Sequence, residues 1–235
     1  MPRTATPAAS TGGKLMMGAV SGTLPKPGLV EGPPGPPAEL PQGAPGPAAG
    51  AARAAVVIPV KAFSKAKLRL APVLAPAERA VLARAMAERV IRACGPLQAV
   101  VVCDDPEVAD WAGTLGARAL TEPGLGLNGA VSAAVSQLAT EGYERLVVAH
   151  ADLPLATRLA WLAGLDGIVL VPDRHDDGTN VISLPASCGF GFSYGPGSFA
   201  RHQEEAGRTG LTWRVVRDPE LAWDVDFPAD MAVLV

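Results

Sequence analysis

Four cationic side chains lie close together in the sequence: Lys61, Lys65, Lys67 and Arg69, all within nine residues. Lysine and arginine form charge-assisted hydrogen bonds with phosphate, each contributing roughly 1.5–3 kcal/mol. A solvated basic face is the commoner explanation of such a run. This run, however, follows the apolar stretch AAVVIPV and precedes a proline-limited loop. We therefore expect these cations to converge on a cleft and to bind the phosphates of a nucleotide.

Three aspartates in distant segments are candidates for binding a metal ion. Asp152 follows the apolar run RLVVAH, and Asp224 and Asp226 lie one residue apart in WDVDFPADM. Mg²⁺ prefers oxygen ligands and usually keeps a substrate phosphate in its coordination shell, and two neighbouring carboxylates are costly without a cation. The three residues therefore predict a Mg²⁺ site opposite the basic run. A helix cap at Asp152 and a solvated turn at the Asp pair stay open as alternatives.

The segment EPGLGLNGAV (122–131) has the G-x-G-x-x-G spacing at Gly124, Gly126 and Gly129, and it precedes a predicted helix over 129–142. In dinucleotide-binding folds this spacing follows the first strand. Here it follows the third predicted strand, whereas the first is followed by the basic run. NAD binding is therefore the weaker interpretation. We expect these glycines to let the backbone approach a purine or a ribose.

A second glycine segment, YGPGS (194–198), precedes another predicted helix. Gly195, Gly197 and Ser198 would place the free N–H groups of that helix near an anion, and Thr179 would add a hydroxyl. From these residues alone, an ordinary glycine turn with Ser198 as the N-cap is favoured. The histidines have no spacing typical of a metal site or a catalytic triad. We expect them to be incidental or to support other site residues; they are His150, His175 and His202.

Apolar runs alternate with amphipathic segments from residue 54 onward. The runs 54–60, 98–103 and 145–150 are rich in β-branched residues, as buried parallel strands are, and 75–95 has helical spacing. This alternation predicts βαβ crossovers and a mostly parallel sheet with helices on both faces. In such sheets ligands bind beyond the carboxyl ends of the strands, which is where the charged residues stand.

The first 50 residues differ in composition from the rest of the chain. They contain 11 of the 23 prolines and 10 of the 26 glycines, too many for ordered packing. We therefore expect residues 1–53 to form a disordered leader and residues 54–235 to form one domain. The net charge of −3 argues against nucleic-acid binding, and no apolar run reaches the ~18 residues of a membrane span. The three cysteines lack C-x-x-C spacing, so a reducing, cytoplasmic setting is expected.

Six segments, taken together and in order, resemble a known family. They are IPVKAFSKAKLRL, EPGLGLNGAV, HADLPL, DGTNVISL, YGPGSFARH and DVDFPADM. The set is similar to the 2-phospho-L-lactate guanylyltransferases of deazaflavin coenzyme (F-420) biosynthesis, a family that includes phosphoenolpyruvate guanylyltransferases. The likeness extends from about Ala55 to the C-terminus. It implies a nucleotidyltransferase-like (Rossmann-like) α/β fold, a three-layer sandwich with a mostly parallel central sheet. It also implies transfer of GMP from GTP to the phosphate of a small acid, with release of pyrophosphate.

The resemblance also implies roles for individual residues. The GTP phosphates would be bound by Lys61, Lys65, Lys67 and Arg69. The guanosine would lie near Gly126, Leu127 and Asn128. Mg²⁺ would be held by Asp152, Asp224 and Asp226. In the phosphoenolpyruvate-using branch, the acceptor would contact Thr179, Gly195 and Ser198. Catalysis is expected to depend most on Lys61, Asp152 and Asp226.

The chain departs from the family pattern at two places near the acceptor side. Phe227 stands where related sequences commonly have a small polar residue, and HDDGTN has fewer glycines than is usual there. Phosphoenolpyruvate is the favoured acceptor, because Thr179, Gly195 and Ser198 match that branch and the Ala/Gly/Arg-heavy composition suggests a high-GC bacterial source. The alternative acceptors 2-phospho-L-lactate and 3-phosphoglycerate stay open, as does the oligomeric state.

Three other classes of protein are also compatible with the sequence. The first is a nucleotidyltransferase of the molybdopterin or sugar-phosphate type, which would share the fold and differ in its acceptor. The second is an NAD(P)-binding Rossmann protein. The third is a nucleotide-binding partner protein without catalytic activity.

Overall fold

The computed structural model describes residues 53–234. The predicted leader, residues 1–53, therefore lies outside the described residues except for Arg53, and Val235 lies outside them as well. Within residues 53–234, no helix has both the length and the apolar character required to cross a lipid bilayer.

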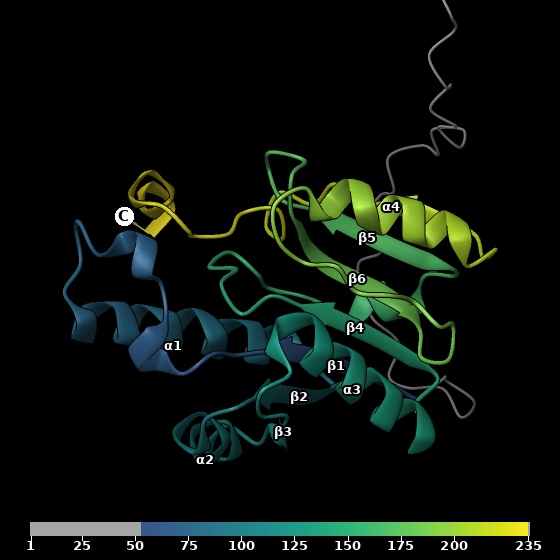
Figure 1. Ribbon diagram of the computed structural model, residues 1–235, viewed down its shortest axis with the longest axis horizontal. Coiled ribbons are helices and arrows are strands. Elements are labelled where there is room, and N and C mark those ends of the chain that lie inside the picture. Colours follow the sequence, from purple (N-terminus) through teal and green to yellow (C-terminus); the bar gives the residue numbers. More distant parts are fainter. Residues whose placement is uncertain (1–52, 235) are drawn as a thin grey trace, which may run out of the picture. The chain divides into compact units, whose positions relative to one another are not determined.

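A seven-stranded sheet forms the centre of this part of the chain (Figure 1). Its strands are β1 (Ala54–Pro59), β2 (Gln98–Cys103), β3 (Arg118–Thr121), β4 (Arg145–Ala149), β5 (Ile168–Pro172), β6 (Thr179–Pro185) and β7 (Trp213–Val215). Their order across the sheet is β3-β2-β1-β4-β6-β5-β7. Of these strands, only β6 runs antiparallel to its neighbours, β4 and β5, so the predicted mostly parallel sheet is confirmed.

Helices cover both faces of the sheet. They are α1 (Pro76–Ala93), α2 (Pro106–Thr114), α3 (Gly126–Thr140) and α4 (Ser198–Arg208). Val56 of β1 belongs to the core under α1 and α2, whereas its neighbour Val57 belongs to the core under α3 and α4. The side chains of successive residues in a strand point to opposite faces of the sheet, so one strand contributes side chains to both cores. Figure 1 shows α3 over β1 and α4 over β5. The predicted three-layer sandwich is confirmed.

The helix after the glycine segment begins earlier than predicted. It starts at Gly126 instead of residue 129, so Gly126, Leu127 and Asn128 form its first turn. The segment follows β3, the third strand along the chain, as predicted. Gly124 and Gly126 have φ angles of 79° and 63°, a region that glycine enters without steric cost. These two glycines therefore shape the entry into the helix.

Candidate active site

Lys67, Arg69, Asp152 and Asp226 form one charged cluster, although three separate segments supply them. The Lys67 Nζ atom lies 2.5 Å from Asp152 Oδ2 and 3.1 Å from Asp226 Oδ1. Arg69 Nη1 lies 2.8 Å from Asp226 Oδ2. The cluster stands just beyond the carboxyl ends of β1 and β4, where ligands bind in sheets of this kind. Two of the four predicted cations thus meet two of the three predicted carboxylates.

Buried anchors hold the basic loop at the sheet edge. After β1 the chain makes two short 3-10 helices, η1 (Phe63–Lys65) and η2 (Leu68–Leu70), and both Phe63 and Leu70 are buried. The ring of Phe63 packs edge-on against Trp111, with centroids 5.0 Å apart. Lys67, between the two turns, has a φ of 49°, a left-handed backbone conformation that is uncommon for residues other than glycine. This conformation lets a loop residue reach the carboxylates, and its side chain is only 10% exposed.

The ion pairs in the cluster dominate the protonation of its members. Burial by itself would raise the pKa of Asp152, but Lys67 and His150 bring that pKa below its usual value. Burial would likewise lower the pKa of Lys67, but Asp152 and Asp226 raise it above its usual value. Both groups are therefore charged at neutral pH.

Asp224 belongs to a different set of contacts. Its Oδ1 lies 3.6 Å from Arg174 Nη1, and the same guanidinium nitrogen donates to the Asp224 carbonyl at 3.1 Å. Burial, with the negative charges of Asp152 and Asp226, raises the pKa of Asp224 to about 6. The negative charges of the other two carboxylates therefore act on Asp224, but its side chain faces Arg174 and not the basic loop.

Asp230 is a site residue that the sequence analysis missed. It is the third residue of η4 (Pro228–Leu234) and only 4% exposed. Its Oδ2 accepts hydrogen bonds from the backbone N–H groups of Asp226 at 2.8 Å and Phe227 at 2.6 Å, and its Oδ1 pairs with Arg174. Asp230 thereby fixes the turn that presents Asp226.

A sequence signal for Asp230 was present. In α1, Pro76 opens the helix and the Glu78 carboxylate accepts from the N–H of Ala75 at 2.7 Å. The segment PAD at 228–230 repeats the PAE of α1, with the acidic residue again two positions after the proline. An acidic third residue that reaches back to the residue before the helix is the second half of a capping box.

Lys61 and Lys65 are exposed, and within residues 53–234 neither forms an ion pair with a carboxylate. The positive charge of Lys61 contributes to lowering the pKa of His150, although burial is the larger cause. The two exposed lysines remain available for an anionic ligand.

Asn128 links the glycine segment to the second predicted glycine loop. Its Oδ1 accepts from the backbone N–H of Tyr194 at 2.8 Å. The first turn of α3, with Gly126 and Leu127, is thus tied to the loop 193–197 that precedes α4. The predicted role of these residues near a guanosine stays a prediction.

Thr179 and Ser198 meet in the interior. The Ser198 hydroxyl accepts from the Thr179 N–H at 3.1 Å, and both side chains are buried. The N-cap of α4 is Gly197 and not Ser198, so the expectation of a serine cap is wrong. The Ser198 hydroxyl is instead the partner of a β6 backbone group. Gly195, by contrast, is exposed and has a φ of 119°.

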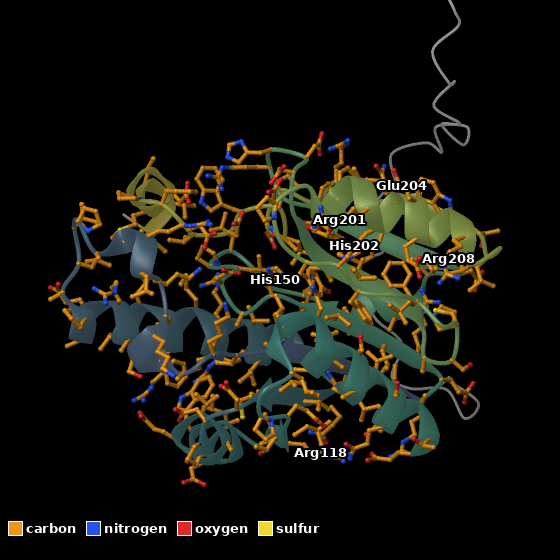
Figure 2. The ribbon with its side chains drawn as sticks, in the orientation of Figure 1. Arg118, His150, Arg201, His202, Glu204 and Arg208 are labelled. Carbon is orange, nitrogen blue, oxygen red and sulfur yellow. The ribbon has the colours of Figure 1, made fainter. Side chains whose placement is uncertain are left out.

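Arg201 secures the loop that contains Gly195. Its Nη2 donates to the Ser193 carbonyl at 2.8 Å and its Nη1 to the Pro196 carbonyl at 2.7 Å. From the other side, the Gly197 N–H donates to Asp177 Oδ1 at 3.1 Å. Figure 2 shows Arg201 and His202 on α4, with His150 nearby. The loop is therefore held in one conformation by side chains on either side of it.

His202 connects this loop to β6. Its Nε2 accepts from the Ser193 N–H at 3.0 Å, so its Nδ1 carries the proton and donates to the Thr179 hydroxyl, also at 3.0 Å. Burial, helped by the nearby positive charge of Arg201, lowers the pKa of His202 to about 4. His202 is therefore neutral at physiological pH and acts as a fixed hydrogen-bonding bridge.

We expect His202 to make the protein less stable in mild acid. In the unfolded chain its pKa returns to about 6.5, so between pH 6.5 and 4 the unfolded state binds the extra proton. The contribution of neutral His202 to the free energy of unfolding is complete above pH 6.5. It is lost progressively as the pH falls to 4, and the whole loss is about 3 kcal/mol. The measurement is the free energy of unfolding against pH for the wild type and for His202→Gln, which lacks the titrating group. Parallel curves for the two proteins over this range would contradict the assignment.

Three buried polar atoms near the cluster have no hydrogen-bond partner within residues 53–234: His150 Nε2, Asp152 Oδ1 and the Tyr194 hydroxyl. The rings of His150 and Tyr194 are 4.9 Å apart, and His150 Nδ1 lies 4.0 Å from Asp152 Oδ1. Buried polar groups are nearly always paired. Asp152 Oδ1 is therefore a carboxylate oxygen that, among the described residues, is free to bind a cation. It lies beside the Lys67 ammonium, which Asp152 and Asp226 share. In the described part of the chain, however, no three His, Cys, Asp or Glu residues are already arranged around a metal position.

Comparison with known proteins finds guanylyltransferases both among family models and among individual relatives. Residues 54–235 match the family model described as "Guanylyl transferase CofC like". The phosphoenolpyruvate guanylyltransferase of Sphaerobacter thermophilus is 41% identical over 187 residues, covering 76% of this chain and 90% of the relative. That of Rubrobacter xylanophilus is 39% identical, covering 76% and 91%. The 2-phospho-L-lactate guanylyltransferase of Methanothermobacter thermautotrophicus is 32% identical, covering 76% and 82%.

Solved structures agree on the fold. A protein from Desulfovibrio desulfuricans assigned as a nucleotide-diphospho-sugar transferase superposes with a TM-score of 0.64 at 20% identity, covering 78% of this chain and 86% of the other. A cytidylyltransferase from Leptospira borgpetersenii gives 0.53 at 12% identity, covering 78% and 85%. These likenesses show the nucleotidyltransferase-like fold. The family match and the relatives together show that the chain belongs to the CofC-like guanylyltransferase family.

Proposed function

We propose that this guanylyltransferase transfers GMP from GTP to phosphoenolpyruvate, with release of pyrophosphate, in coenzyme F-420 biosynthesis. The observation that carries the proposal is the cluster of Lys67, Arg69, Asp152 and Asp226 at the carboxyl ends of β1 and β4. The names of the relatives support the choice of acceptor, because the two most similar relatives described above are phosphoenolpyruvate guanylyltransferases. The 2-phospho-L-lactate enzyme is less similar.

The reaction joins two anions, so charge neutralisation and positioning supply most of the catalysis. A phosphate oxygen of the acceptor forms a bond to the α-phosphorus of GTP, and the bond from that phosphorus to the bridging oxygen breaks, so that pyrophosphate leaves with the electron pair. We propose that the cations of the basic loop bind the triphosphate and stabilise the leaving group. They are Lys61, Lys65, Lys67 and Arg69.

The carboxylates of the cluster fit a divalent cation. Asp152 and Asp226 already share one positive charge, and Asp152 Oδ1 is a buried oxygen without a partner in the described residues. We propose that they hold Mg²⁺ together with Asp224, whose raised pKa reflects burial and the charges of the other two. Bound Mg²⁺ would supply the positive charge that lets the acceptor phosphate approach the α-phosphate.

On the acceptor side, the contacts divide the three proposed residues into two kinds. Gly195 is exposed in the loop, so we propose that its backbone lies against the acceptor. Thr179 and Ser198 are buried and bonded to each other, so we propose that they support the loop from behind. The guanosine is proposed to lie over the first turn of α3, near Gly126 and Asn128.

Arg201→Met should raise the KM for the acceptor and leave the KM for GTP unchanged. The substitution removes the hydrogen bonds to the carbonyls of Ser193 and Pro196, which hold the loop in its conformation. Losing hydrogen bonds from a charged group such as Arg201 corresponds to about a tenfold rise in the KM for the acceptor. The matched control is Arg208→Met, which removes an exposed arginine of the same helix that pairs with Glu205. Equal rises in both KM values, or none, would contradict this role.

The proposal is tested by identifying the product by mass. Purified protein with Mg²⁺ is incubated with GTP, CTP or ATP and with phosphoenolpyruvate, 2-phospho-L-lactate or 3-phosphoglycerate. We expect a GMP adduct of phosphoenolpyruvate and an equal amount of pyrophosphate. An adduct only with another acid or another nucleotide would replace the acceptor or donor named here. GTP binding without any adduct would favour a non-catalytic protein, and stabilisation by NADH but not by GTP with Mg²⁺ would favour a Rossmann protein.

A further inference from the structure

The Lys67 ammonium stands between two carboxylates that we propose as metal ligands. It lies 2.5 Å from Asp152 Oδ2 and 3.1 Å from Asp226 Oδ1, and the side chain is 10% exposed. We propose that Lys67 and the metal ion compete for this position, so that the metal binds tightly only when GTP offers the displaced ammonium a new partner. The inference rests on the proposed function, because it takes Asp152 and Asp226 as metal ligands.

The oxygen atoms of the two carboxylates show why a metal ion and the Lys67 ammonium oppose each other. Asp152 Oδ2 and Asp226 Oδ1 accept from Lys67, and Asp226 Oδ2 accepts from Arg69 at 2.8 Å. The remaining oxygen, Asp152 Oδ1, is buried and has no hydrogen-bond partner in the described part of the chain. A divalent ion that bonds to both aspartates must therefore approach at least one oxygen that already accepts from these cations, and its charge repels them there. Lys67 is the cation that bridges the two side chains.

The backbone on either side of Lys67 is held in place. Within residues 53–234, Lys67 and Asp176 are the non-glycine residues with positive φ. Such conformations carry a cost and recur at functional sites where the surroundings enforce them. The 3-10 turns η1 and η2 on either side are anchored by buried Phe63 and Leu70. Lys67 therefore exchanges partners by rotating its flexible side chain, without moving the anchored turns.

The consequence is a coupling between the metal and the nucleotide. Metal alone must break the contacts of Lys67 and leave its charge among the other cations of the loop. Metal with GTP breaks the same contacts but provides phosphate oxygens for the ammonium. Such a difference makes each ligand raise the affinity for the other. Lys67 thus keeps the carboxylates neutralised until the substrate arrives.

The test measures Mn²⁺ binding to the full chain without nucleotide, from the decrease of the free-ion paramagnetic resonance signal. Lys67→Met should bind Mn²⁺ at least about tenfold more tightly than the wild type, because a pair of charge-assisted hydrogen bonds no longer opposes the metal. The matched control is Lys65→Met, which removes one charge from the same loop and should bind like the wild type. Equal affinities of Lys67→Met and the wild type would overturn the inference, as would an equal gain in Lys65→Met.

A second measurement needs no variant. Acetic anhydride labels free amines, and mass spectrometry follows the labelling of Lys67 relative to Lys65. Saturating Mn²⁺ without GTP should increase the relative labelling of Lys67 several-fold, because the ammonium leaves the carboxylates. Unchanged labelling at saturation would overturn the inference. If the wild type still forms the GMP adduct, the proposed function survives that result. If no adduct forms and Mn²⁺ does not bind even with GTP, the proposed function falls as well.

Discussion

Asp152→Asn is expected to lower the rate of GMP transfer by at least about 10²–10³-fold. The Asp152 carboxylate bonds to Lys67 and provides the buried oxygen beside it, so the substitution removes charge from the centre of the proposed metal site. An amide of the same shape keeps the packing, and the backbone bond from Val225 N–H to the Asp152 carbonyl is unaffected. The measurement is pyrophosphate release at saturating GTP and acceptor, with Mg²⁺ varied.

Two further variants make this result interpretable. Asp226→Asn should lose activity to a similar extent, because it faces the same ammonium. Asp110→Asn, an exposed carboxylate of α2, should behave as the wild type. Asp152→Asn and Asp226→Asn each leave Lys67 one carboxylate and one amide oxygen as acceptors, so both should remain folded at the assay temperature, which thermal unfolding checks. Normal Mg²⁺-dependent pyrophosphate release by Asp152→Asn and Asp226→Asn would refute the role proposed for these aspartates.

Asp230→Ala is expected to cost about 3 kcal/mol of stability and to reduce turnover as well. The substitution leaves two backbone N–H groups, those of Asp226 and Phe227, without their acceptor. It also removes the shorter of the two ion pairs that the half-buried Arg174 forms within residues 53–234, and leaves it the longer contact with Asp224. Removing one partner of a buried hydrogen bond or ion pair is more costly than the interaction is worth, because the remaining partner is less well compensated. The turn that presents Asp226 should loosen as a result.

Glu78→Ala is the control for Asp230→Ala. It removes the equivalent acidic residue from α1, where the carboxylate is exposed and accepts one backbone hydrogen bond. We expect a loss of only about 0.5–1 kcal/mol and no change in turnover. Chemical denaturation and steady-state kinetics on both variants are the measurements. If Asp230→Ala were no more harmful than Glu78→Ala, Asp230 would have only an ordinary capping role.

Much of the fold was predictable because burial leaves a pattern in the sequence. Continuous apolar runs predicted β1, β2 and β4, and the residues after them were correctly placed at one edge of the sheet. The direction of β6 did not follow from its composition, because an apolar run has the same composition in either direction. The sign that was overlooked is the six-residue connection from β5, 173–178, which is too short for a parallel crossover. The start of α3 was misplaced because glycine at a first helical turn resembles a loop.

The site was predictable in its chemistry and less so in its geometry. Sequence alone did not distinguish Lys67 from Lys65, because the difference depends on a left-handed backbone conformation at Lys67. It also did not show that Ser198 is buried against Thr179, since a serine beside a glycine is equally typical of an exposed cap. Asp230 was missed although its proline spacing repeats that of α1. In each case the missing information was the direction of a side chain.

The most direct test of the central claim is a crystal structure with a non-hydrolysable GTP analogue and Mn²⁺, in which anomalous scattering locates the metal. We predict a metal peak bonded to Asp152 and Asp226, the α-phosphate beside it, and Lys67 on the triphosphate instead of between the two carboxylates. A nucleotide bound elsewhere, with no metal at the two aspartates and Lys67 still between them, would contradict the claim.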